Sequence, residues 1–340
     1  MYTTIGWLLS SLLISSLLVR FAIGYAHRRG MLDQPGQRRS HRLPTPRGGG
    51  IGLVVAMLLC LPGILWSFPA GWSARSIVCL LAALLLVALA GWWDDHRALP
   101  VLPRLGAQLL GVGIFSLGLL TDGPSWWWLP VLLIGGAWSI NLHNFMDGID
   151  GLLAQQAIFV GAGLAVLAWS AMQSALAVAA ASLAAAALGF WYYNRPPARI
   201  FMGDVGSGSV GVLIFAFSAM LWRRENALLW PALILSSAFT VDAGLTLLVR
   251  IWRGRRWYTA HREHLYQWLV RLRGTHTQAD AAYLGWNLLV AAPSAWLAWS
   301  HLQMALPITM IVYLGATAAW LTLKRLCLRR HLPKAPHVPA

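Results

Sequence analysis

The chain has 340 residues, of which 58% are hydrophobic and 11% are charged, and its formal net charge is +15 at pH 7. Positive mean hydropathy and repeated apolar blocks of roughly 20 residues exclude an ordinary soluble globular protein and indicate an integral membrane protein. The surplus of basic residues would also suit a polyanion-binding protein, so their placement along the chain decides between the two explanations.

Eleven segments are apolar enough to cross about 30 Å of hydrocarbon. In chain order they cover residues 4–24, 49–68, 75–92, 105–121, 125–141, 152–171, 173–191, 207–222, 229–249, 281–300 and 304–323. We therefore expect an all-α, polytopic integral membrane protein with about 11 transmembrane helices. Residues 1–323 are expected to form one membrane-embedded domain, and residues 324–340 a basic cytoplasmic tail.

Basic residues between the spans predict the orientation. If the N-terminus is periplasmic, 22 of the 26 lysines and arginines lie on the cytoplasmic side, and only Arg75, Arg223 and Arg224 lie on outward loops. Cytoplasmic loops typically carry such an excess of positive charge. We expect a cytoplasmic C-terminus and spans that are surrounded by membrane lipids. Because this topology explains most of the net charge, nucleic acid is not expected as a partner.

The acidic residues are few and are concentrated on cytoplasmic loops. These loops cover residues 25–48, 92–104, 142–151, 192–206 and 250–280. Five of the eleven acids stand at the cytoplasmic ends of spans: Asp94, Asp95, Asp147, Asp150 and Asp204. Carboxylates near a membrane face repel one another and are costly to desolvate unless a cation compensates them. The pattern therefore predicts a cation site facing the cytoplasm.

The chemistry that fits these acids is a divalent cation bound together with a substrate phosphate. Magnesium takes hard oxygen ligands and typically uses one or two carboxylates, phosphate oxygens and water. Glycines follow Asp147 and Asp150 directly and surround Asp204 in the motif "GDVGSGSVG", and glycine lets the backbone approach a ligand closely. Taken singly, each glycine motif also fits a turn or close helix packing. Together they favour a phosphate site in which some acids bind the metal and others act on the reacting group.

Positive charge comes from the segment "RIWRGRRWYTAHREHLYQ", which begins at residue 250. His261 and His264 are three positions apart and share a face if the segment is helical. Arginine can bind a diphosphate bidentately, and histidine can donate to it. Topology explains most of the arginines, so we single out Arg262 and His264 as substrate-binding residues. Asp242, inside the ninth span, is expected to accept a hydrogen bond between helices or to pair with Arg250.

Five motifs follow one another between Leu32 and Gln267: "LDQPGQRRSHRLPTPRGGG", "GWWDDHRALP", "NFMDGIDGL", "YYNRPPARIFMGDVGS" and "AHREHLYQ". In this order and topology, the chain resembles the polyprenyl-phosphate N-acetylhexosamine-1-phosphate transferase superfamily of the MraY/WecA type. The forms "AHREHLYQ" and "HRLPTPRGGG" are most similar to the WbpL-like branch that initiates O-antigen synthesis.

The resemblance implies a reaction and its partners. A UDP-N-acetylhexosamine and undecaprenyl phosphate would give undecaprenyl-diphospho-sugar and UMP, initiating O-antigen, lipopolysaccharide or a related cell-surface polysaccharide. The implied cofactor is Mg²⁺, for which Mn²⁺ can substitute. The sequence does not decide whether the protein forms a homodimer. It also does not decide between direct transfer and a phospho-aspartate intermediate.

The resemblance also implies roles for individual residues. Asp204 and Asp150 match metal-binding positions, whereas Asp94, Asp95 and Asp147 match catalytic acids. The positions expected to bind nucleotide or substrate are Asn144, Asn194, Phe201, Arg262, His264 and Arg47. An asparagine amide can pair with a uracil edge, and an aromatic ring can stack on it.

One stretch departs from the pattern of the family. Several relatives carry clustered histidines, roughly "DRDHIHH", where this chain reads "HREHLYQ". His264 keeps its place, but Tyr266 and Gln267 replace two histidines. Because this loop is expected to help choose the sugar, the choice among FucNAc, QuiNAc, GlcNAc and another HexNAc stays open.

Two other classes of membrane protein use similar residues. A transporter of an anionic substrate would place acids and arginines near the middle of the membrane, whereas here the acids cluster at one face. An intramembrane prenyltransferase also uses aspartates and magnesium, but it usually needs a third acid in the pattern that Asp94 and Asp95 begin. Here His96, Arg97 and Ala98 follow instead.

Overall fold

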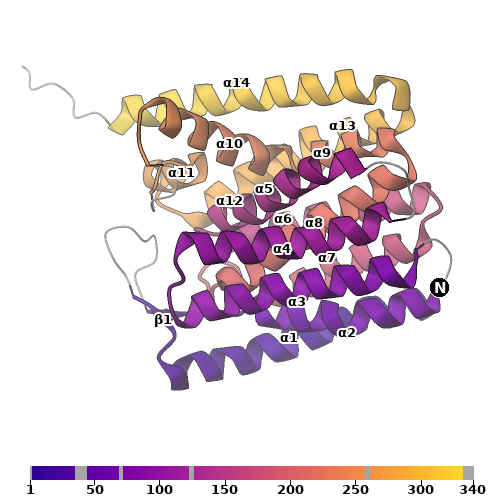
Figure 1. Cartoon of the computed structure of the whole chain (residues 1–340). Coiled ribbons are helices and arrows are strands. Elements are labelled where there is room, and N and C mark those ends of the chain that lie inside the picture. Colours follow the sequence, from indigo (N-terminus) through magenta and orange to yellow (C-terminus); the bar gives the residue numbers. More distant parts are fainter. Residues whose placement is uncertain (1, 35–43, 69–71, 122–125, 257–260, 332–340) are drawn as a thin grey trace, which may run out of the picture.

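The structure, a computed structural model, describes residues 2–34, 44–68, 72–121, 126–256 and 261–331. Within these residues nearly all secondary structure is α-helical, which confirms the predicted all-α membrane fold. The helices lie side by side along one direction (Figure 1). The buried apolar side chains from α1 to α14 form one main core.

The helices are α1 (Tyr2–Arg29), α2 (Ile51–Ser67), α3 (Ala74–His96), α4 (Val101–Leu120), α5 (Leu129–Phe145), α6 (Leu152–Ser170), α7 (Ser174–Asn194), α8 (Gly203–Arg224), α9 (Leu229–Leu235), α10 (Ser237–Trp252), α11 (Leu265–Arg273), α12 (His276–Trp286), α13 (Ala292–Ser300) and α14 (Ala305–His331). Short 3-10 turns are η1 (Trp126–Trp128), η2 (Asn226–Leu228) and η4 (Leu302–Met304), and η3 (Asn287–Ala291) is a π-helical segment. Strands β1 (Leu32–Asp33) and β2 (Thr45–Pro46) pair antiparallel.

Each of the eleven predicted spans falls on a helix or on two consecutive helices. Among the described residues, seven helices are long and apolar enough to cross a membrane, or eight if α9 and α10 form one span bent by 76°. The seven are α1, α3, α4, α6, α7, α8 and the segment that contains α14. The total of eleven spans therefore stays a prediction.

Two predicted spans are interrupted helices. Residues 229–249 are divided between α9 and α10, and buried amides bind the backbone at the break. Gln156 Nε2 donates to the Leu235 carbonyl at 3.2 Å, and Asn287 Nδ2 donates to Gln156 Oε1 at 2.7 Å. Such side chains satisfy backbone groups that a broken helix leaves free inside a membrane protein. Residues 281–300 contain the π-helical turn η3 between α12 and α13.

Helix α8 is the central helix of the molecule. Of the most apolar stretch of 18 residues in α8, 83% is buried inside the protein, against 17% of the corresponding stretch in α1. Helix α8 packs against α3 and α5. Glycines bring two neighbouring helices against its first turn. A Cβ on Gly50 would lie 2.3 Å from Gly206 Cα, and a Cβ on Gly91 would lie 2.4 Å from the Asp204 carbonyl oxygen. The acids at the end of α3 are thereby placed beside the acid that begins α8.

The strands and α11 lie at one end of the helical stack, away from the N-terminus (Figure 1). Contacts join all five of the predicted cytoplasmic loops at this end. Arg47 binds the end of α3, and Asn144 binds the start of α8. Tyr266 donates to the Phe145 carbonyl. The loops therefore meet at one end of the molecule, and the cytoplasmic side of this end stays a prediction.

Candidate active site

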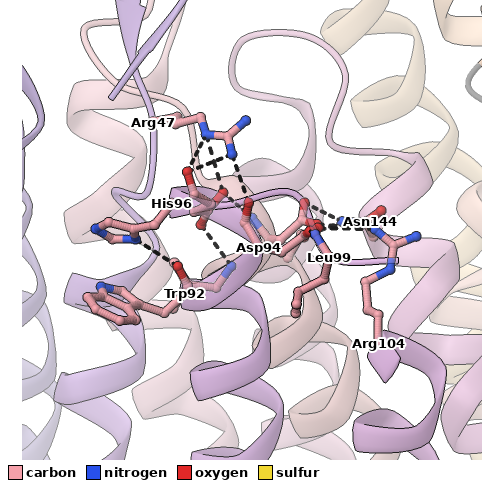
Figure 2. Close-up of polar contacts among 11 residues, drawn as sticks. Arg47, Trp92, Asp94, His96, Leu99, Arg104 and Asn144 are labelled. Atoms are coloured by element: carbon pink, nitrogen blue, oxygen red, sulfur yellow. Dashed lines mark hydrogen bonds and ion pairs between the residues drawn. The ribbon is translucent and has the colours of Figure 1, made fainter. Parts of the chain in front are cut away.

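Asp204 is the meeting point of side chains from three other helices. Asn144 Nδ2, on α5, donates to Asp204 Oδ1 at 2.8 Å. Arg104 Nη1, on α4, lies 3.4 Å from Asp204 Oδ2 and 3.2 Å from Asp94 Oδ2. Asp94, on α3, therefore shares the Arg104 guanidinium with Asp204. Figure 2 shows Asp94, Arg104 and Asn144 around this point. Arg104 therefore bridges two carboxylates that would otherwise repel.

The two adjacent acids of α3 have different surroundings. Asp95 is only 5% exposed, and its carboxylate accepts from the amides of Asp204 at 3.0 Å and Val205 at 3.1 Å. It therefore caps the first turn of α8. Asp94 accepts from the Leu99 amide with one oxygen, and its other oxygen faces Arg104. Of the predicted catalytic pair, only Asp94 faces the cluster around Asp204.

A positive φ at Gly203 makes this capping contact possible. Gly203 has φ +75°, and a Cβ there would lie 2.5 Å from Asp95 Oδ2. Only glycine combines this backbone conformation with so close an approach. The glycine before Asp204, which the sequence associates with ligand binding, here admits a carboxylate from α3.

Arg47 lies over the end of α3 (Figure 2). Its guanidinium donates to the carbonyl of Asp95 at 2.6 and 3.0 Å and to that of Asp94 at 3.0 Å. Its Nε is also 3.7 Å from Asp95 Oδ1. A cation at the carbonyl end of a helix is favourable. The side chain is 34% exposed, so Arg47 both orders the acids and presents charge at the edge of the site.

Asp147 joins the cluster from the loop between α5 and α6. The pKa of its carboxyl is raised well above the usual range, first by burial and then by the negative charges of Asp204 and Asp95. An amide hydrogen bond from Gly203 opposes this shift of the pKa. A bound cation would relieve the repulsion among these acids.

Asp150 occupies a different place from Asp147. One carboxylate oxygen accepts from the Ala198 amide at 3.0 Å, and the other lies 3.1 Å from His276 Nδ1. Asp150 therefore connects the start of α6 to α12 and to the loop after α7. Its predicted role at the metal stays a prediction, because these contacts are with neither Asp94 nor Asp204.

Asn194 and Phe201 bind backbone groups that hold the loops together. Asn194 is buried, accepts from the Gly151 amide at 3.0 Å and donates to the Ile200 carbonyl at 2.9 Å. The backbone of Phe201 donates to the carbonyl of Pro46, in β2, and accepts from the amide of Gly49, which follows β2. These contacts shape the site, and the expected contacts of both side chains with the nucleotide are not tested.

His264 is buried at the start of α11. Its ring stacks with Phe145 at a centroid distance of 6.2 Å and with His261 at 4.9 Å. Burial lowers the pKa of His264, as do nearby cations, although Asp242 opposes the shift. The lowered pKa favours the neutral form of the imidazole. Arg262 is half-buried, and its carbonyl accepts from Arg271 Nη2 at 2.9 Å.

Tyr266 shows what the departure from the family's histidine pattern does. Its hydroxyl donates to the Phe145 carbonyl at 3.0 Å and accepts from Gln267 Nε2 at 3.2 Å. A Cβ on Gly148 would lie 2.0 Å from this hydroxyl oxygen, so only glycine leaves room for it. Tyr266 thus packs α11 directly against the loop that carries Asp147.

Asp242, on α10, holds the first turn of α11 in place. Its carboxylate accepts from the Leu265 amide at 2.7 Å, from Tyr283 Oη at 2.7 Å and from Trp320 Nε1 at 2.9 Å. This confirms the expected hydrogen bonds between helices. Arg250, the alternative partner, pairs instead with Glu263.

Sequence reasoning missed Arg104 and His276 as site neighbours. Arg104 entered the prediction only as one basic residue of a cytoplasmic loop. Its position at the start of the helix that follows Asp94 is the available signal, because a short turn folds the two helices antiparallel. No comparable signal marks His276, which is 126 residues from Asp150.

Oxygen donors make up the cluster, and this suits Mg²⁺. In the described ranges, no group of three or more His, Cys, Asp or Glu side chains forms a complete metal site. Magnesium does not require one, because it commonly binds one or two carboxylates together with phosphate oxygens and water. Asp204 and Asp94 supply two such carboxylates.

A large cavity runs along α5 between the acid cluster and the opposite end of the molecule. Its volume is about 790 Å³, and α5, α8, α9 and α10 contribute its lining. The lining is mostly apolar and extends from Trp128 to His143, next to Asn144 in the chain. A cavity of this size and character can hold a long apolar group.

Comparison with known proteins identifies similar sequences. The model of glycosyl transferase family 4 matches residues 77–222. The phospho-N-acetylmuramoyl-pentapeptide-transferase of Geobacillus kaustophilus is 30% identical over 271 residues, which cover 72% of this chain and 80% of that protein. The decaprenyl-phosphate N-acetylglucosaminephosphotransferase of Mycolicibacterium smegmatis is 29% identical over 333 residues, with 83% and 80% covered.

Proposed function

Since the chain belongs to glycosyl transferase family 4, the polyprenyl-phosphate hexosamine-1-phosphate transferases, we propose that it transfers a HexNAc-1-phosphate from a UDP-N-acetylhexosamine to undecaprenyl phosphate. The products are undecaprenyl-diphospho-sugar and UMP. The observation that carries this proposal is the convergence of Asp94, Arg104 and Asn144 on Asp204. Family membership favours a transferase over the alternatives of a transporter or a prenyltransferase.

In this proposal Asp204 and Asp94 hold Mg²⁺, and Asp147 lies close enough to take part. The sequence-based alternative places Asp150 at the metal, but its contacts, with Ala198 and His276, are with neither Asp94 nor Asp204. When bound, Mg²⁺ would neutralise charge on the diphosphate of the donor. Mn²⁺, with the same preference for oxygen ligands, would substitute.

An oxygen of the lipid phosphate attacks the β-phosphorus of the UDP-sugar. A new P–O bond forms as the bond from the β-phosphorus to the bridging oxygen breaks, and UMP leaves with that oxygen and its electron pair. Such a reaction depends mainly on positioning and on stabilisation of charge. Asp94 orients the lipid phosphate and accepts its proton if it carries one. Arg104 stabilises negative charge between Asp94 and Asp204.

The donor binds between the acid cluster and α11. His264 can donate one hydrogen bond to a phosphate or sugar oxygen in its neutral form, and Arg262 supplies positive charge. Asn144, with Phe201 and Arg47, borders the nucleotide site in this proposal, and Asn194 holds its loops. The prenyl chain lies in the 790 Å³ cavity along α5.

The chain is a multi-pass bacterial membrane protein, and we place it in the inner membrane with the site facing the cytoplasm. The excess of basic residues on the loops of the site supports this orientation. We further propose that its product initiates O-antigen or a related polysaccharide, which the "AHREHLYQ" motif supports. Tyr266 in place of a histidine favours a sugar other than MurNAc-pentapeptide.

The test uses purified full chain, undecaprenyl phosphate and a panel of UDP-sugars, with the lipid product identified by mass. Release of UMP is expected to require both lipid phosphate and Mg²⁺. Asp204→Asn should lower turnover by about 10²–10³-fold, because it removes a charge from the reacting centre. If Asp204→Asn turns over as fast as the wild type in Mg²⁺, the metal assignment is wrong.

A further inference from the structure

A second, basic cavity lies between the ends of α10 and α14, beside α11. Its volume is about 360 Å³. Four basic side chains and one acid line it, together with two tryptophans, two leucines and a valine. The charged residues are Arg253, Arg255, Lys324, Arg325 and Glu263. The reaction proposed above uses none of them.

Helical spacing produces this lining. Leu321, Lys324, Arg325 and Leu328 lie on one face of α14, because they are separated by three, one and three positions. Arg253, just past the end of α10, lines the same cavity as Lys324. The ends of α10 and α14 therefore place positive charges around the same cavity.

The acid in the lining does not balance these cations. The Glu263 carboxylate already pairs with Arg250 and with Arg255, the latter at 2.9 Å. Lys324 Nζ donates to the Glu263 backbone carbonyl at 2.7 Å. With the residues that the structure describes, Arg253 and Arg325 form no ion pair. The cavity therefore favours an anion.

Apolar side chains close in the chain to the cavity residues are exposed on both helices. On α10, Leu248 is 62% exposed and Ile251 is 55% exposed, and Trp252 is 86% exposed. On α14, Leu328 is 40% exposed. Exposed apolar side chains at the end of a membrane helix, next to basic residues, mark the level of lipid headgroups. An occupant that combines a negative charge with acyl chains matches both parts of this surface.

We propose that the cavity between α10 and α14 binds the phosphate of an anionic membrane phospholipid, whose acyl chains lie along the exposed apolar side chains of both helices. Basic pockets between transmembrane helices on the cytoplasmic side bind such headgroups. Because Lys324 holds the Glu263 carbonyl next to His264, the bound lipid braces the segment that enters α11. Lipid composition would then influence the donor site.

The test measures lipid binding directly, so its result does not depend on the proposed reaction. Native mass spectrometry of the detergent-solubilised full chain counts retained dioleoylphosphatidylglycerol and dioleoylphosphatidylcholine. The wild type should retain the phosphatidylglycerol preferentially. R253Q/R325Q should bind it about 30-fold more weakly, because two charge contacts are lost. R253K/R325K keeps the charges and should bind nearly as well as the wild type.

R28Q/R29Q is the matched control, since it removes two arginines from the end of α1 on the same predicted face. This control should retain phosphatidylglycerol like the wild type. Equal retention of the two lipids by the wild type, or unchanged binding by R253Q/R325Q, would overturn the proposal. Excess inorganic phosphate tests whether the cavity binds free phosphate or the phosphate of a lipid headgroup. If it displaces the phosphatidylglycerol, the site binds free phosphate and the lipid assignment is wrong.

Discussion

At the scale of single residues, neighbouring acids in the chain have separate tasks. Asp94 faces Arg104 and Asp204, whereas Asp95 accepts two backbone amides of α8. Asp147 and Asp150 diverge in the same way, the first toward the acid cluster and the second toward His276. One member of each pair is thus available to a substrate, and the other connects helices and loops.

Asp94→Ala and Asp95→Ala are therefore expected to fail for different reasons. Asp94→Ala should lower turnover by about 10²–10³-fold and lower Tm less than Asp95→Ala does, because it leaves only the Leu99 amide without an acceptor. Asp95→Ala leaves two buried amides of α8 without an acceptor and should also reduce stability by about 1–3 kcal/mol. UMP release and thermal unfolding in the same detergent check this. Equal Tm values for the two variants would contradict the capping role of Asp95.

At the scale of elements, the active site depends on how α11 and α8 are held. α11 begins at His264 and is anchored by Asp242, which lies more than 20 positions earlier in the chain. α8 begins at Gly203, where glycines of α2 and α3 let the backbones approach closely. Both elements present their first turns to the site, so displacement of either should alter binding without removing a reacting group.

Asp242→Asn should raise KM for the UDP-sugar about tenfold, with a smaller change in kcat. The amide keeps one acceptor oxygen, but its NH₂ group meets donors such as Tyr283 Oη, so α11 and His264 shift. Steady-state kinetics at varied UDP-sugar concentrations measure the changes in KM and in kcat separately. Thr246→Val is the matched control, because Thr246 donates to the same carboxylate at 3.2 Å from one turn further along α10. Equal effects on KM in both variants would argue against positioning.

Gly91→Ala should disturb α8 much more than Gly106→Ala does. A Cβ on Gly91 would lie 2.4 Å from the Asp204 carbonyl oxygen, whereas a Cβ on Gly106 meets nothing within 4 Å. Overpacking of this kind costs about 1–3 kcal/mol. Gly106→Ala should be neutral or slightly stabilising because alanine favours helix. Thermal unfolding and UMP release compare the two, and an unchanged Gly91→Ala protein would refute the close contact.

At the scale of the whole molecule, the proposed orientation follows from charge and places every loop of the site on one side. The arginines and lysines near that side would cross the membrane only at great cost, so the orientation should be robust. A fluorescent protein fused to the C-terminus is expected to fluoresce, and alkaline phosphatase at the same point is expected to be inactive. The opposite pair of results would reverse the topology and exclude a cytoplasmic site.

Much of this protein could be predicted from local sequence. Apolar length determines where helices form, because an unpaired backbone is too costly in lipid. The scarcity of acids makes Asp94, Asp147 and Asp204 stand out at the ends of those helices. Class, helix positions and a cluster of acids on shared loops all follow from such local signals.

Only the tertiary structure decided which side chains meet. Asp95 turns to α8 because Gly91 and Gly203 let α3 and α8 touch. Arg104 and Asp242 gain their roles from helices that pack beside them. The spacing of the acids along the chain, one residue for Asp94 and Asp95 and three for Asp147 and Asp150, does not reveal such partners. Close packing fixes the direction of each carboxylate, and the contacts responsible join residues that are distant in the chain.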